Sequence, residues 1–256
     1  MMRSTTSDKP RGRVRLWAVC FWLIVWQLLA MIVSQEILLA SPLNVLKRLC
    51  ALAVTAEFWQ TIAFSLWRIL GGFLLGCLAG AVLAALAARF QWVRELIAPF
   101  VALVRAIPVA SFVIVALIWV PSRNLSLLIA GLIVWPVTYT NLLYGIDETD
   151  PGLIEMASTF RVPPTRRLLF IYVPQVLPYF RAAVVTSMGL AWKSGVAAEV
   201  IGIPTGSIGE RLYRAKVYLM TPDLFAWTLA LIAVSLVCER LFILIVDAGI
   251  HRLERM

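Results

Sequence analysis

The chain has 256 residues, of which 61% are hydrophobic and only 14% are charged. Soluble domains contain roughly 45 to 50% apolar residues, so this composition excludes an ordinary soluble protein and indicates a polytopic membrane protein. The formal net charge of +9 would suit nucleic acid, but lysines and arginines retained in cytoplasmic loops explain it more simply, and no nucleic-acid partner is expected.

The N-terminal residues 1–15 form a basic stretch that is followed by the apolar run Leu16–Val33. A basic stretch before an apolar run also begins a signal peptide. This run is long for a signal peptide, however, and no small-residue cleavage site closes it. We therefore expect a cytoplasmic tail at 1–15 and then an uncleaved first transmembrane helix.

Six apolar segments are long enough to cross a hydrocarbon core of about 30 Å. They cover Leu16–Val33, Thr61–Ala88, Ala98–Val120, Leu125–Gly145, Val176–Val200 and Leu224–Ala248. The sequence thus predicts an all-α membrane protein with about six transmembrane helices. Within the second segment, glycines and alanines recur at four-residue spacing, which predicts a face where helices pack closely.

The distribution of lysine and arginine predicts the orientation of these segments. With the N-terminus inside, the inner segments hold twelve of these residues and the outer loops hold six. Positive residues are enriched on the cytoplasmic side, so both termini and the stretch 147–175 are expected in the cytoplasm. An even number of segments agrees with termini on the same side.

No repeat and no low-complexity linker divides the chain, so we expect one transmembrane domain at 61–250. The first transmembrane helix and an outer connector occupy 16–60 before it. A short cytoplasmic tail is expected at 251–256.

The stretch 147–178 is polar but is patterned like a helix. Asp150 before Pro151 is a favourable helix start, because Asp accepts from free backbone N–H groups and proline at the first position loses no bond. Leu153, Ala157 and Phe160 recur at helical spacing and predict one apolar stripe. Pro163 and Pro164 are expected to end this helix, which therefore covers about 150–163. A short amphipathic helix between two membrane segments suggests a docking surface for a partner protein.

The same residues carry a resemblance. Glu155-Met156-Ala157, followed by Ile171-Tyr172-Val173-Pro174, resembles the EAA motif of ABC importer permeases, the binding-protein-dependent inner-membrane component family. In that family the motif forms a cytoplasmic coupling helix that sits in a groove of the ATPase subunit. Met156 replaces the second motif residue, and Arg161 stands where the motif has a glycine, a residue that readily adopts a positive φ.

Further segments resemble the sulfonate, taurine and nitrate branch of this family, over about residues 60 to 250. They are Ser65-Leu66-Trp67-Arg68 with Gly72-Phe73, Arg105-Ala106-Ile107-Pro108 with Ala110, and Ala191-Trp192 with Ala198-Glu199, Gly206 and Gly209. The resemblance implies a type I ABC importer permease fold in the bacterial inner membrane. It also implies two permease subunits, identical or related, two cytoplasmic ATPase subunits and an extracytoplasmic solute-binding protein. The solutes of that branch are sulfonates, nitrate and small vitamin precursors.

The resemblance implies that one group of residues couples the permease to the ATPase. These are Leu153, Glu155, Ala157, Phe160, Arg161 and Arg166. The charged members have plainer interpretations: Glu155 is also favoured near a helix N-terminus by the helix dipole, and the arginines also fit an ordinary inside-positive loop.

A second group of candidate residues, for the translocation path or its outer gate, comprises Lys193, Glu199, Gly206 and Gly209. Ionisable residues inside apolar segments are costly and often functional, and irregular backbone at membrane depth requires surrounding protein or a water-filled cavity. Glycine and proline are equally common in ordinary outer connections, and that alternative stays open. Arg68 and Arg240 lie near segment ends, from which they can reach the membrane interface.

The sequence contains no P-loop and no paired-cysteine or histidine pattern for zinc, so no cofactor or metal is expected on this chain. The chain is therefore expected to be a transport subunit, not an enzyme, with ATP hydrolysed on a partner subunit. The alternatives are a secondary transporter driven by an ion gradient, which needs buried acids on its own helices, and a structural membrane protein without transport.

Overall fold

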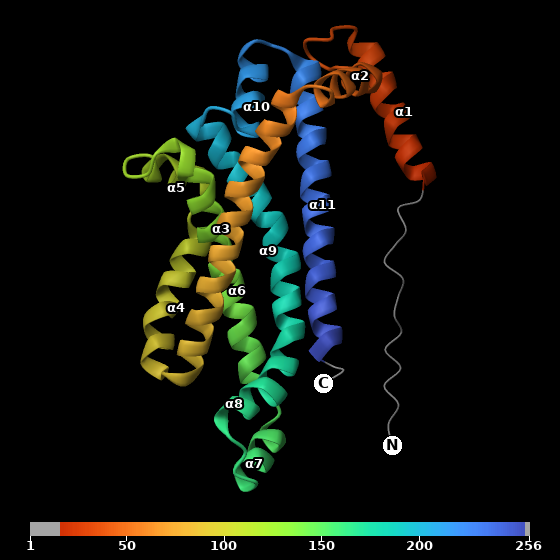
Figure 1. Ribbon diagram of the computed structural model, residues 1–256. Helices are drawn as coiled ribbons and strands as arrows, with labels where there is room; N and C mark the ends of the chain where they lie inside the picture. The colour runs from red at the N-terminus through yellow and green to blue at the C-terminus, as the bar shows by residue number, and fades with distance from the viewer. Residues whose placement is uncertain (1–15, 254–256) are drawn as a thin grey trace.

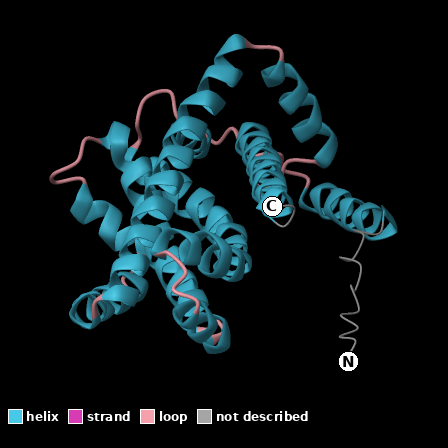
Figure 2. Cartoon of the chain, turned by 60° about the horizontal axis from the view of Figure 1, so that its bottom comes forward, coloured by secondary structure: helices cyan, strands magenta, loops and turns pink. Residues whose placement is uncertain are grey.

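A computed structural model describes residues 16–253, and every element in that range is helical (Figures 1 and 2). The elements are α1 Leu16–Val33, α2 Pro42–Ala53, α3 Ala56–Arg89, α4 Gln91–Ala106, α5 Val109–Ala116, α6 Ser122–Asp147, α7 Pro151–Thr159, α8 Pro164–Arg167, a π-helical turn η1 Leu168–Tyr172, α9 Val173–Gly202, α10 Ile208–Val217 and α11 Thr221–Leu253. The predicted all-α fold is confirmed. The predicted tail at 1–15 and the residues 254–256 lie outside the described range.

The long helices α3, α6, α9 and α11 run side by side in Figure 1, with α2 and α10 at one end and α7 and α8 at the other. The helix α4 stands beside α3 from the α7 end and stops partway up. The two candidate regions of the sequence, around α7 and around α10, therefore lie at opposite ends of the bundle.

The packing of α3 on α6 depends on the small residues that recur at four-residue spacing in α3. A Cβ atom added at Gly76 would lie 2.7 Å from the Gly131 carbonyl oxygen and 2.8 Å from the Val134 Cβ atom. Only glycine lets the two backbones approach so closely. The predicted packing face is confirmed.

Helix α9 completes the central bundle through a hydrophobic cluster. Ile69 and Phe73 of α3 pack with Met188, Trp192 and Val196 of α9, and all five are buried. The three helices α3, α6 and α9 thus form the core against which the other elements are placed.

Four helical stretches of the described chain are long and apolar enough to cross a membrane. They are Ala56–Arg89, Ser122–Asp147, Pro164–Gly202 and Thr221–Gly249, and the pair α4 and α5 would count as a fifth if it acts as one bent span. The apolar part of α1, Trp17–Val33, is shorter than these. The chain is therefore multi-pass, but the predicted count of six is not confirmed.

The predicted segment Ala98–Val120 is not one continuous helix. It is divided between α4 and α5, which meet at 103°. Ile107 stands before Pro108, whose ring disfavours helical backbone in the preceding residue, and Ile107 has extended angles of φ −75° and ψ 127°.

Other parts of the chain also differ from the sequence prediction. The outer connector contains the helix α2, whose start is capped by the Ser41 hydroxyl, which accepts from the Asn44 N–H. The fifth predicted segment starts twelve residues earlier, because the helical backbone is continuous from Pro164 to Gly202. Pro174 cannot donate a backbone hydrogen bond, and the π-helical turn immediately before Val173 lets the helix continue past it.

Candidate functional site

The start of α7 follows the sequence prediction. The Asp150 side chain accepts a hydrogen bond of 2.8 Å from the Gly152 N–H, and Pro151 occupies the first helical position. The first turn of a helix leaves backbone N–H groups without partners. Asp150 accepts from one of them, and Pro151 has no N–H group that needs a partner.

The end of α7 falls at Thr159, so the predicted end near residue 163 is four residues too late. The Val162 N–H donates to the Ala157 carbonyl at 2.9 Å, and the Arg161 N–H donates to the Ser158 carbonyl at 3.1 Å. These two bonds form a Schellman motif, in which one residue takes the left-handed conformation. Arg161 is that residue, with φ of 50°. The turn that the motif glycine would favour is thus formed with arginine in its place.

The predicted apolar stripe of α7 is divided between two faces. Ala157 is fully buried within the chain, whereas Leu153, Met156 and Phe160 are 37, 48 and 75% exposed. Glu155, Arg161 and Arg166 are also exposed. Ala157 therefore packs α7 against its own chain, and the outer face of α7 presents apolar and charged side chains together.

Side chains beyond the predicted set hold α7 in place. The Arg167 guanidinium donates to the Val162 carbonyl at 2.8 Å and to the Ala157 carbonyl at 3.0 Å. The Asp150 N–H donates to the Gln175 side chain at 2.9 Å, which joins the start of α7 to the start of α9. A basic residue soon after a helix end is a recognisable signal for the first contact. No sequence signal identifies the second, which joins residues 25 positions apart.

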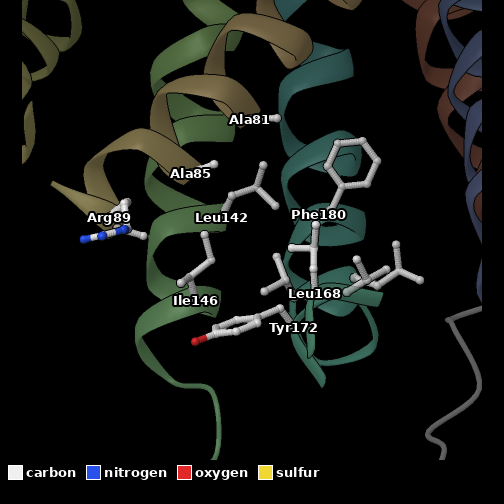
Figure 3. A pocket seen from close by; sticks show the side chains of 12 residues that line it. Ala81, Ala85, Arg89, Leu142, Ile146, Leu168, Tyr172 and Phe180 are labelled. Carbon is white, nitrogen blue, oxygen red and sulfur yellow. The ribbon is translucent and has the colours of Figure 1, made fainter. Parts of the chain in front are cut away.

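An apolar groove of about 560 Å³ lies directly above this region (Figure 3). Its walls are Ala81 and Ala85 of α3, Leu142 of α6, Tyr172 of η1 and Phe180 of α9. The first turns of α9 are thus separated from α3 by open space at this level, although α9 and α3 are packed together further along.

At the other end of the bundle, Glu199 of α9 is fully buried. Its Oε2 atom accepts hydrogen bonds from the Ser65 hydroxyl at 2.7 Å and from the Gly209 N–H at 3.2 Å. The Ser65 oxygen in turn accepts from the Ile208 N–H at 2.9 Å. We call Ser65, Glu199, Ile208 and Gly209 the outer clamp, because they join α3, α9 and the start of α10.

The outer clamp brings together two of the four residues predicted for the path or gate, Glu199 and Gly209. A Cβ atom on Gly209 would meet the backbone of Glu199 and Val200, so the close approach requires glycine. Gly206 has φ of 84° in the turn before α10. Lys193 is exposed, about 120° around the helix axis from Glu199, so the two charges lie on different faces of α9.

The turn between α9 and α10 is strained at Ile203, which has φ of 47°. This left-handed conformation is unfavourable for a β-branched residue. The Ile203 N–H donates to the Glu199 carbonyl at 2.8 Å and so closes the end of α9.

Ion pairs surround the α10 end of the bundle. Arg48 of α2 pairs with Asp223 of α11, Arg211 pairs with Glu57, and Arg214 pairs with Glu210. Hydrogen bonding to Asp223 raises the pKa of Arg48 above its ordinary value. A pocket of about 260 Å³ lies among these residues.

Comparison with known proteins shows the family to which the chain is similar. The family of binding-protein-dependent transport system inner membrane components matches residues 72–255. The chain is 27% identical over 237 residues to the putative aliphatic sulfonates transport permease protein SsuC of Escherichia coli strain K12, covering 91% of this chain and 86% of that protein.

Two other relatives are named for other solutes. The nitrate import permease protein NrtB of Synechococcus elongatus is 24% identical over 83% of this chain and 81% of its own length. The taurine transport system permease protein TauC of Escherichia coli strain K12 is 25% identical over 90% of this chain and 82% of its own length.

These matches favour the importer over the ion-driven and the purely structural alternatives. In such systems the ATPase is a separate subunit, and the family implies a solute-binding protein as a further partner. The chain belongs to the binding-protein-dependent transport system inner membrane component family, and it is a multi-pass permease subunit of an ABC importer, not an enzyme.

Proposed function

We propose that this permease couples ATP hydrolysis to solute import through α7, which docks on a cytoplasmic ATPase subunit. The observation that carries the proposal is the exposed outer face of α7, where the apolar side chains of Leu153, Met156 and Phe160 lie beside Glu155. Exposed apolar groups rimmed by polar groups are typical of an interface with a partner. The neighbouring Arg161 and Arg166 would meet acidic groups on that partner.

The connection from α7 to the opposite end of the bundle supports a mechanical role. Arg167 and Gln175 fix α7 to the base of the helical stretch Pro164–Gly202, and the outer clamp fixes the far end of that stretch to α10. A displacement of α7 by a closing ATPase would therefore be passed along one helical body. The groove beside Tyr172 leaves room for the base of α9 to move (Figure 3).

In this mechanism the outer clamp and the α9–α10 turn act as the outer gate. Glu199 and Gly209 would hold the gate closed in the conformation described, and Gly206 would supply the freedom of its turn. Lys193, on the exposed face of α9, would line the path and not the gate. ATP binding would favour the state in which the gate opens, and hydrolysis would restore the first state.

The assembly that we propose has two copies of this chain, both with their termini in the cytoplasm. The exposed apolar side chains of α1 and α11 would then face membrane lipid. The two-to-one excess of lysine and arginine in the inner segments supports this orientation and places α7 where an ATPase can reach it.

The solute that we propose is a small anion, such as an organic sulfonate or nitrate. The names of the three relatives support this class, since each of those proteins is named for transport of a sulfonate, taurine or nitrate. A small vitamin precursor remains the competing solute.

Co-purification tests the proposal. The tagged chain, expressed with the ATPase of its own organism, should retain the ATPase in stoichiometric amount. Substitution of both Met156 and Phe160 by Asp should release it, because charges would replace the exposed apolar contacts. Thr165→Asp, on the exposed part of α8, is the matched control. Retention of the ATPase by the double variant would refute docking through α7.

A further inference from the structure

Arg105 is the last residue but one of α4, and α4 ends partway along the bundle (Figure 1). Near the start of α4, Arg94 pairs with Asp147 at 2.8 Å, and the exposed aromatic rings of Phe90 and Trp92 are typical of a membrane interface. Arg105 follows Arg94 by eleven residues, a rise of about 16 Å. That rise places its Cα near the middle of a hydrocarbon core of about 30 Å.

The guanidinium group of Arg105 has spare hydrogen-bonding capacity. One of its nitrogens donates to the Thr140 hydroxyl at 2.6 Å and to the Pro136 carbonyl at 3.4 Å. A guanidinium has five N–H donors, and the Arg105 side chain is exposed. None of the ion pairs among the described residues includes it. An exposed cation at this depth is too costly to face lipid tails, so it must face protein or water.

The partner of Arg105, Thr140, lies on the side of α6 that faces away from α3. Thr138, two residues earlier, packs against Gly80 of α3, and two residues turn a helix by about 200°. The same relationship holds on α9, where Gly195 packs against Ile69 of α3 and Lys193 lies two residues before it. The side of α6 and α9 opposite α3 therefore carries Lys193 and the Thr140 hydroxyl, and the Arg105 guanidinium reaches that hydroxyl from α4.

We propose that Arg105 is the anion-binding residue of the translocation path, where it receives the oxyanion group of a small sulfonate, carboxylate or nitrate solute. The planar fork of a guanidinium matches the oxygens of such groups in a bidentate arrangement. Thr140 orients the fork, and Lys193 adds a second positive charge to the same side of the bundle. This inference rests on the proposed function, since it requires a path for an anion between the two permease subunits.

Charge-selective labelling of the assembled transporter in nanodiscs tests the inference without knowledge of the solute. A single cysteine replaces Thr140 in a chain in which the four native cysteines are substituted. The probes are the anionic 2-sulfonatoethyl methanethiosulfonate and its cationic trimethylammonium analogue, each with its rate normalised to a free thiol in water. We expect the anionic probe to react at least about tenfold faster than the cationic one, because one fixed positive charge lies beside the thiol. Arg105→Gln should abolish this preference, and Arg105→Lys should keep it.

Two further variants keep the test decisive. Ala102→Cys, on the exposed part of α4 one turn before Arg105, should show the same preference if Thr140→Cys does not assemble. Leu103→Cys, exposed but about 200° around α4 from Arg105, should face lipid and stay unlabelled. Equal normalised rates for the two probes would overturn the inference, and so would absence of labelling at both 140 and 102 while an outer Tyr218→Cys is labelled. The co-purification test of α7 is independent of this labelling, so failure of the proposed function is distinguishable from failure of the anion site.

Discussion

Ser65 of α3 donates a 2.7 Å hydrogen bond to Glu199 of α9, and the same hydroxyl oxygen accepts from the first residue of α10. One side chain thus binds one oxygen of a buried carboxylate and caps a helix start, although the two are far from it in the sequence. The arrangement makes the α10 end of the bundle a single unit, because neither α3 nor α10 can leave α9 without breaking these hydrogen bonds.

A double-mutant cycle on this pair should reveal strong coupling. Glu199→Ala leaves the buried Gly209 N–H and Ser65 hydroxyl unpaired, and each such group costs about 1–3 kcal/mol. Ser65→Ala removes one of these groups, so the double variant should be less destabilised than the sum of the single variants by about 0.5–3 kcal/mol. Thermal unfolding of the purified variants measures the effect. Ser187→Ala, whose hydroxyl donates only to its own helix at Ala183, should be additive with Glu199→Ala.

The contact between α3 and α6 predicts opposite outcomes for two glycines of the same helix. Gly76→Ala places a methyl group 2.7 Å from the Gly131 carbonyl oxygen, and the overlap should cost about 1–3 kcal/mol. Gly71→Ala places it 3.5 Å from the Leu127 Cδ1 atom, an ordinary contact, and should gain up to about 1 kcal/mol from helix propensity. Tryptophan fluorescence during heating follows both variants. Equal unfolding temperatures would show that the backbones are not so close.

The turn after α7 should be improved by glycine. The positive φ of Arg161 destabilises the folded chain by about 1–2 kcal/mol, a strain that glycine would not have. The greater freedom of glycine in the unfolded chain offsets about 0.4–1 kcal/mol of that stabilisation. Arg161→Gly should therefore slow hydrogen exchange of the backbone amides at 160–162. Arg166→Gly, at a helical position of α8, should speed exchange. Faster exchange in Arg161→Gly would contradict the Schellman turn.

Arg167 is expected to transmit movement from α7 to α9. Arg167→Ala removes its bonds to the Val162 and Ala157 carbonyls, and bonds from charged donors contribute about 1.5–3 kcal/mol each. The transporter should still assemble, but stimulation of ATP hydrolysis by the loaded binding protein should fall severalfold. Thr165→Ala, two residues away on α8, should keep full stimulation. Normal stimulation in Arg167→Ala would remove this residue from the coupling mechanism.

Local chemistry made much of the fold predictable. The Asp150–Pro151 helix start, the close packing face around Gly76 and the short helix after α6 all follow from residues near one another in the chain. The break at Ile107 was not predicted, because the hydrophobicity of the surrounding run favoured one continuous segment over the effect of Pro108 on the residue before it.

Contacts between distant residues were not predictable in this way. Glu199 was identified as a costly buried acid, but its partner Ser65 lies 134 positions earlier, and no local pattern relates the two. The helical spacing of Ala157 and Phe160 suggested one face, yet Ala157 is buried and Phe160 is exposed. Arg167 and Gln175, which follow α7 in the sequence, hold it in the orientation that buries Ala157.

The most direct test of the central claim is cross-linking of α7 to the ATPase in membranes. A single cysteine at Phe160, which is 75% exposed, should form a cross-link to a cysteine in the surface groove of the ATPase, and its yield should change when ATP is added. A cysteine at the buried Ala157 should give little product and serves as the control. No cross-link from position 160 under any nucleotide condition, in a complex that still holds the ATPase, would contradict coupling through α7.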